Sequence, residues 1–167
     1  MELSLYPWIL WLHILASIVF FFVHGATIAV AFRLPEEKTM EGMRALLNIT
    51  GITSPYFFGS FLLLQAFGIV LVFSAEWWKQ IWPWLSFALL NGMAIWMTWY
   101  GRKVYSPLRK ALGMPYITGF SKENKPVAPT SMEEIHVILN KANPRVLTWV
   151  GGIISGIILW LMTFKPF

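Results

Sequence analysis

Long uncharged runs of apolar residues dominate the chain, and shorter polar connections separate them. The runs cover 5–32, 56–75, 81–100 and 146–164. An α-helix rises about 1.5 Å per residue, so about 20 apolar residues cross the hydrocarbon core of a bilayer. Each run is long enough, and none alternates with the period of two that a transmembrane β-strand requires. We therefore expect an all-α polytopic membrane protein, with four transmembrane helices in one domain over 1–167.

Basic residues are concentrated in two of the connections. Of the 13 lysines and arginines, 11 lie within 33–55 and 101–145. Cytoplasmic loops carry such an excess, so both connections are expected in the cytoplasm and both termini outside. Tryptophans gather near the ends of the runs, as residues of the membrane interface do. The predicted topology is N-out and C-out across a bacterial cytoplasmic membrane.

The connection at 33–55 contains two patterns that are typical of helix starts. Pro35 is followed by two glutamates, which stabilise the first turn of a helix through its dipole. Met43 and Leu47 then share one apolar face, so this helix is expected at the inner interface or as an extension of the second span. Residues 53–55, Thr-Ser-Pro, predict a cap and a first-turn proline where that span begins.

The connection at 101–145 is the largest polar part of the chain. Its segment 121–130 has the composition of a loop, with two prolines and several polar side chains. Ser131 and Glu134 have the spacing of a capping box. We expect one short amphipathic helix after this box, lying along the membrane surface.

Composition agrees with a membrane protein. The chain is 57% hydrophobic and only 13% charged, whereas soluble domains carry about 25% charged residues. It contains no cysteine, which excludes disulfides, thiolate zinc sites and iron–sulfur ligation. The net charge of +5 comes from bases that lie between apolar runs. The expected partner is therefore the lipid bilayer, and nucleic acid is not expected.

Two histidines within the first run are candidates for cofactor binding, because ionisable side chains are costly in lipid. His13 and His24 are eleven residues apart, so they share a helix face at an axial separation of about 16.5 Å. Neutral imidazole is a ligand of haem b in membrane cytochromes. Met97, which lies at a similar depth, or His136 on the short helix are candidates for the second ligand, as is a residue of a partner subunit. The alternative is that both histidines hydrogen-bond neighbouring helices and serve only the structure.

Methionines suggest a second kind of ligand set. Met93 and Met97 are one turn apart in the third run. Together with the imidazole of His24, their thioethers are suitable ligands for Cu(I). Methionine is also an ordinary filler of helix interfaces, and this alternative stays open.

Four polar side chains fall close to the middle of the four runs. A layer of this kind is either a path for protons or ions or a set of hydrogen bonds between helices. The residues are Ser17, Gln65, Asn91 and Ser155.

Small residues recur at intervals of four in the last run. This spacing allows a second helix to approach closely, within the bundle or in a partner such as another membrane subunit or a second copy. The residues are Gly151, Gly152, Ser155 and Gly156.

Catalytic motifs are absent from the sequence. It contains no phosphate-binding loop, no nucleophile elbow and no zinc-protease motif. All eight acidic residues are glutamates outside the four runs. We therefore do not expect an enzyme, except as a subunit of an electron-transfer complex.

The first run resembles that of small four-helix bacterial membrane proteins of the copper-resistance-D-like type and of their uncharacterised relatives. The resemblance implies four helices, a basic cytoplasmic connection and a role in copper handling, with His13 and Gly25 at the family's positions. The chain differs in having a second histidine and no tryptophan just before the glycine. The segments that carry the resemblance are Leu12-His13-Ile14-Leu15-Ala16 and Phe22-Val23-His24-Gly25.

These patterns favour one function and leave two alternatives. The favoured hypothesis is a non-catalytic membrane subunit or accessory protein of a respiratory or other electron-transfer assembly, binding haem b through His24 or His13. One alternative is a small transporter of copper, protons or ions. The other is a purely structural membrane protein.

Overall fold

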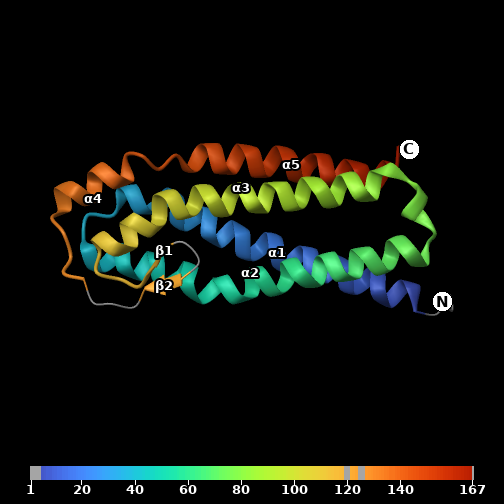
Figure 1. Ribbon diagram of the computed structural model, residues 1–167, viewed down its shortest axis with the longest axis horizontal. Helices are drawn as coiled ribbons and strands as arrows, with labels where there is room; N and C mark the ends of the chain where they lie inside the picture. The colour runs from blue at the N-terminus through green and yellow to red at the C-terminus, as the bar shows by residue number, and fades with distance from the viewer. Residues whose placement is uncertain (1–4, 119–120, 124–126, 167) are drawn as a thin grey trace.

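A computed structural model describes residues 5–118, 121–123 and 127–166. These residues form long helices with one small hairpin (Figure 1), so the expected all-α class is confirmed apart from the hairpin. In chain order the elements are α1 (Tyr6–Arg33), η1 (Leu34–Glu36), α2 (Met40–Ser74), η2 (Trp77–Lys79), α3 (Ile81–Ala111), β1 (Tyr116–Thr118), β2 (Ser121–Glu123), α4 (Met132–Leu139) and α5 (Pro144–Phe164).

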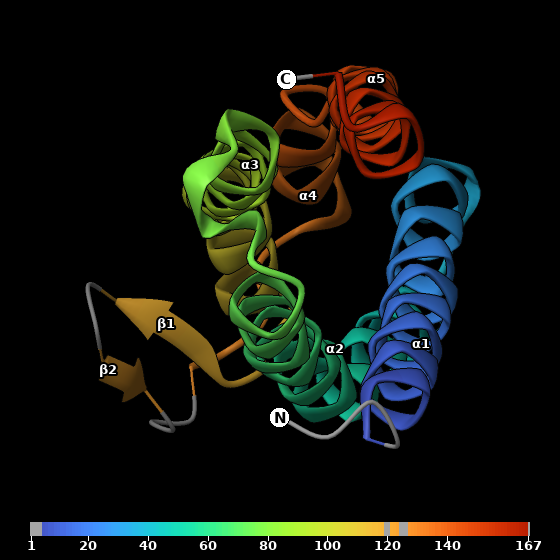
Figure 2. The same ribbon diagram turned by 90° about the vertical axis from the view of Figure 1, so that its right-hand side faces the viewer.

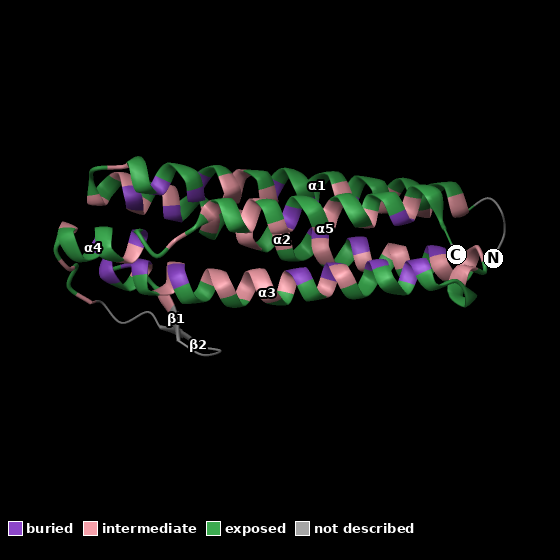
Figure 3. Cartoon of the chain, turned by 90° about the horizontal axis from the view of Figure 1, so that it is seen from above, coloured by how far each residue is buried: buried purple, intermediate pink, exposed green. Residues whose placement is uncertain are grey.

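Three helical segments are long and apolar enough to cross a membrane: Tyr6–Glu36, Met40–Ser74 and Met132–Phe164. Helix α3 is not among them, because tryptophans, a proline and Asn91 lower the hydropathy of its uncharged part. Many large apolar side chains are exposed on the outside of the bundle. Figure 3 shows that exposed residues occur along every long helix. Soluble monomers rarely expose so much contiguous apolar surface, and this surface indicates a membrane protein.

The helices form two pairs that run the length of the molecule. Helix α1 packs mainly against α2, and α3 packs mainly against α5, with fewer contacts between the pairs. In the view down the bundle axis, the α1–α2 pair lies opposite the α3–α5 pair (Figure 2). The start of α1, the end of α5 and the turn between α2 and α3 lie at one end, where Lys165 Nζ lies 3.9 Å from the centroid of the Trp77 ring.

The opposite end carries the α1–α2 connection, the hairpin and α4 (Figure 1). We call it the basic end because most of the described lysines and arginines belong to it. Strands β1 and β2 pair antiparallel, with Tyr116 opposite Glu123. The sequence predicted a loop for 121–130. The structure instead places β2 at the start of this segment, because residues 121–123 pair with β1. Residues 124–126 of that loop lie outside the described residues.

Helix α2 begins at a different residue from either sequence prediction. Its N-cap is Thr39, whose hydroxyl accepts a hydrogen bond from Gly42 N at 3.1 Å. Pro35 lies in the short η1 turn, and Pro55 lies inside α2. Neither proline starts α2. Non-helical residues 37–39 separate Pro35 from the helix, and at Pro55 the chain is already helical from Met40, where one missing N–H is tolerated within a membrane helix. The segment at 40–55 therefore extends the second span, one of the two expected outcomes.

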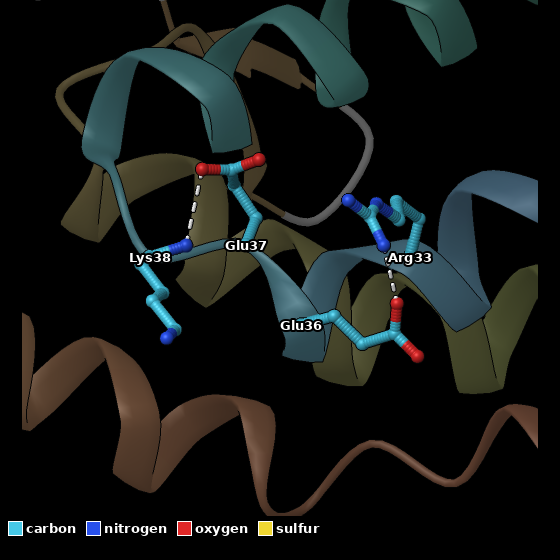
Figure 4. Close-up of polar contacts among 4 residues, drawn as sticks. All are labelled: Arg33, Glu36, Glu37 and Lys38. Carbon is cyan, nitrogen blue, oxygen red and sulfur yellow. Dashed lines mark hydrogen bonds and ion pairs between the residues drawn. The ribbon is translucent and has the colours of Figure 1, made fainter.

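The turn before α2 is organised by a carboxylate (Figure 4). Glu37 Oε1 accepts a hydrogen bond from Lys38 N at 3.0 Å, drawn in Figure 4. It also accepts hydrogen bonds from Thr39 N at 3.0 Å and from the Thr39 hydroxyl at 2.8 Å. These bonds, chiefly those from Thr39, hold the pKa of Glu37 below its usual value. In the same turn Arg33 forms an ion pair with Glu36 at 2.6 Å.

A hydrophobic core closes the basic end. The ends of α1, α2 and α3 meet α4 there, and Leu34, Met43, Leu108 and Ile135 are almost completely buried. Ser131 caps α4 by accepting a hydrogen bond from Glu134 N at 3.3 Å, as the capping box predicts. The short amphipathic helix of the third connection is therefore present, and its apolar face packs against the bundle end.

Candidate functional site

A cavity of about 520 Å³ lies between α1, α2, α3 and α5, in the half of the bundle toward the basic end. Its wall is mostly apolar, and sites for small molecules and cofactors usually have volumes of about 300–1,000 Å³. Side chains from all four helices contribute to it, among them Phe20, His24, Phe57, Met93, Met97 and Leu147.

His24 and Met97 converge within this cavity next to Gly151. A Cβ atom built on Gly151 would lie 2.7 Å from Met97 Cε and 3.7 Å from His24 Nε2. Both atoms are thus within 4 Å of one point on the buried face of α5. The structure therefore brings together, from α1 and α3, two of the side chains that the sequence suggested as cofactor ligands. Because glycine has no side chain, α5 leaves them room.

The imidazole of His24 has aromatic neighbours. It stacks on the ring of Phe20, with centroids 6.0 Å apart and an angle of 4° between planes, and the centroid of Phe57 is 5.8 Å away. No hydrogen bond joins this imidazole to any described residue. Polar groups inside proteins usually have a hydrogen-bond partner, so these ring nitrogens are suited to an external ligand.

The other two histidines have partners of their own. His13 Nδ1 donates a hydrogen bond to Leu64 O at 3.0 Å and so joins α1 to α2. The ring of His13 packs against Gly68, where an added Cβ would be 3.1 Å from His13 Cε1. His136 is exposed, and its Nδ1 lies 2.8 Å from Met132 O within α4. Neither residue lines the cavity.

Met93 lies on the same cavity wall as Met97 and is almost completely buried against Phe20 and Leu64. Three side chains with imidazole or thioether donors thus face one cavity. Among the described residues, no group of three or more His, Cys, Asp or Glu side chains is arranged to hold a metal ion.

The four residues of the expected midplane layer do not form a continuous path. Asn91 Nδ2 donates to Gln65 Oε1 at 2.7 Å and links α3 to α2. The hydroxyl of Ser17 instead donates to His13 O, in its own helix, at 2.8 Å. Ser155 is half-buried on α5, and none of the four residues lines the cavity. The structure therefore joins two members of the layer into a hydrogen bond between helices.

The small residues of α5 face in two directions. Gly151 is buried beside the cavity, as described above. Gly152 and Gly156 are exposed, and an added Cβ on either would meet nothing within 4 Å. Of these three glycines, only Gly151 therefore permits a close approach within the chain itself.

The basic end of the cavity contains residues that the sequence analysis did not select. Arg109 donates from Nε to Pro115 O at 2.8 Å and from Nη1 to Leu47 O at 3.0 Å. Arg109 and Tyr105 are both half-buried at this end of the cavity.

A signal for this end was present in the sequence. Arg102 and Arg109 are seven residues apart in a continuous helix, a spacing that returns to nearly the same face after about two turns. Both arginines line the cavity. In the sequence, both arginines were counted only as markers of topology, so their shared face was missed.

Comparison of the chain with family models, with curated proteins and with solved structures finds no match.

Proposed function

We propose that this chain is a non-catalytic electron-transfer subunit of a bacterial cytoplasmic membrane, and that its cavity binds haem b between His24 and Met97. The observation that carries the proposal is the convergence of His24 Nε2 and Met97 Cε beside Gly151. Both side chains face an apolar cavity of about 520 Å³, and His24 has no hydrogen-bond partner among the described residues.

The proposed topology has four spans, α1, α2, α3 and α5, with both termini outside. It is supported by the position of the start of α1 and the end of α5 at one end of the bundle and of most of the described bases at the other. Helix α3 belongs to the set because its residues 81–100 carry no charge and have the length of a span. Its tryptophans suit the membrane interface.

The residues around the cavity fit the proposed cofactor. Histidine and methionine are a known pair of axial haem ligands, and methionine raises the reduction potential. When bound, haem would supply one-electron redox chemistry. The chain's own residues would hold and orient it, with Phe20 and Phe57 restraining the His24 ring and the apolar wall excluding water.

The variants His24→Ala and Met97→Ala test this proposal, with His13→Ala as the matched control on α1. Haem content per chain is measured after mild purification, by conversion to the pyridine haemochrome. We expect stoichiometric haem in the control, little or none in His24→Ala and a changed axial-ligand spectrum in Met97→Ala. Equal haem content in the His13 and His24 variants would refute the assignment.

Copper binding is a second candidate, supported by the position of Met93 on the same wall as His24 and Met97. The resemblance of the first helix to copper-resistance-D-like proteins agrees with it. Met93→Leu separates the two candidates, because it removes one thioether that only the copper site requires. If the wild-type protein contains copper and no haem, and Met93→Leu loses that copper, the copper site is favoured.

A further inference from the structure

The charged side chains that line the cavity are all basic. Arg102 and Arg109 lie toward its basic end, and no acidic residue is among those lining it. Arg109 is half-buried, and both groups that accept its hydrogen bonds are neutral backbone carbonyls. No carboxylate of the described residues pairs with it. A partly buried cation without a counter-ion is unfavourable, so this end of the cavity favours an anionic group on the ligand.

The direction of α3 places these charges within reach of the ligand site. Arg102 follows Met97 by five residues and Arg109 by twelve, which correspond to about 7.5 Å and about 18 Å along the helix axis. Side chains on a helix lean toward its N-terminus, and on α3 that direction leads back toward Met97. Both arginines line the cavity, so their side chains border the space that the ligand would occupy.

We propose that Arg109, assisted by Arg102 at the mouth, binds the carboxylate of the cavity ligand and so orients its apolar body toward His24. Arg109 uses its Nε–H and one Nη1–H in the bonds to Pro115 and Leu47, which leaves three of the five guanidinium N–H groups for an anion. A guanidinium matches the geometry of a carboxylate. The inference deepens the proposed function, on which it rests: for haem b, the carboxylates are its two propionates.

The test uses the full-length protein in detergent, stripped of cofactor, and three probes. Haem b carries both iron and propionates, metal-free protoporphyrin IX carries only the propionates, and haem dimethyl ester carries only the iron. Binding is followed by absorbance or by porphyrin fluorescence. We expect the wild-type chain to bind haem b at least about tenfold more tightly than the dimethyl ester, a difference typical of charge-assisted hydrogen bonds.

Arg109→Gln should weaken binding of haem b and of protoporphyrin IX by about the same factor of ten and leave the dimethyl ester unchanged. Arg109→Lys should restore part of the affinity. Arg44→Gln is the matched control, because Arg44 lies at the same end and donates to Leu112 O at 2.8 Å but does not line the cavity. If Arg109→Gln fails to fold, the comparison of acid and ester on the wild-type chain still decides the question.

The outcomes separate this inference from the proposed function. Equal affinity of the wild-type chain for haem b and its ester, or equal affinity of wild type and Arg109→Gln for protoporphyrin IX, overturns the role of Arg109. Binding of protoporphyrin IX that depends on Arg109, without any effect of His24→Ala on haem, supports the inference and refutes the proposed ligation. Absence of binding by all three probes overturns both.

Discussion

Gly151 is a residue of α5 that lies beside both proposed ligands. A methyl group there would lie 2.7 Å from Met97 Cε, which is closer than carbon atoms normally approach, and 3.7 Å from His24 Nε2. We predict that Gly151→Ala displaces the Met97 side chain and lowers haem affinity by about 10- to 100-fold, as is common for residues that support metal ligands.

Gly152→Ala is the control for this prediction, because it adds the same methyl group one residue along, where it meets nothing within 4 Å. Haem titration of both variants measures the difference. If the two variants bind haem equally well, the convergence at Gly151 has no part in cofactor binding.

His13 has a different predicted role from His24. Its hydrogen bond to Leu64 O joins α1 to α2, and such bonds contribute about 0.6 kcal/mol on average in membrane proteins. His13→Leu should therefore lower the free energy of unfolding by about 1 kcal/mol or less and leave the optical spectrum unchanged. Reversible unfolding in mixed micelles measures the free energy of unfolding. A lost Soret band in this variant would contradict the assignment.

The sequence predicted some of these residue roles and missed others. Counting depth along the runs paired His24 with Met97, because helix rise is regular. It could not separate His13 from His24, since the partner of His13 is a backbone carbonyl and has no sequence signature. It also treated Arg109 as a topology marker, because its position on the cavity wall depends on how α3 packs.

At the level of elements, the turn before α2 depends on the ionised form of Glu37. Its pKa is lowered in the folded protein, chiefly by hydrogen bonds from Thr39, so the carboxylate stabilises the fold above its unfolded pKa, near the ordinary value of 4.5. This contribution is lost as pH falls below that value through the folded pKa. We predict that Glu37→Gln is less stable than wild type at neutral pH and that the difference disappears in acid.

Thermal unfolding at several pH values measures this effect. Glu36→Gln is the matched control, because its exposed ion pair with Arg33 contributes little. A difference between wild type and Glu37→Gln that stays constant from neutral pH to strongly acidic pH would show that the carboxylate does not organise the turn.

Helix existence was predicted more reliably than helix ends. The apolar runs identified α1, α2, α3 and α5 because their length and lack of charge are properties of the sequence itself. The start of α2 was misplaced, since Pro35 and Pro55 each resemble a first-turn proline. Thr39 caps the helix instead, and the hydrogen bonds of Glu37 that support it come from a turn without a recognised motif.

For the whole molecule, the main prediction is that α3 crosses the membrane. The chain contains no cysteine, so single cysteines introduced at chosen sites are unambiguous probes. Gln80 precedes α3 and Asn140 follows α4. In sealed right-side-out vesicles, an impermeant maleimide should label Gln80→Cys directly and Asn140→Cys only after permeabilisation. Labelling of both sites from the same side would contradict the four-span topology.

The sequence could predict the long apolar helices but not the cavity. Charge distribution and apolar length suggested where the chain meets lipid and water. The cavity exists because α1 packs on α2 and α3 packs on α5, with fewer contacts between the pairs, and pairwise helix packing is not encoded in any single run. The core at the basic end was missed for the same reason, since helix ends distant in sequence build it.

The most direct test of the account is an optical spectrum of the wild-type protein, oxidised and then reduced with dithionite, after gentle purification from its native membrane. Haem b held by His24 predicts a Soret band, a reduced α-band of b-type haem, and loss of both in His24→Ala. A featureless spectrum in the wild-type protein, with the chain folded and monodisperse, would contradict the proposal that this cavity binds haem.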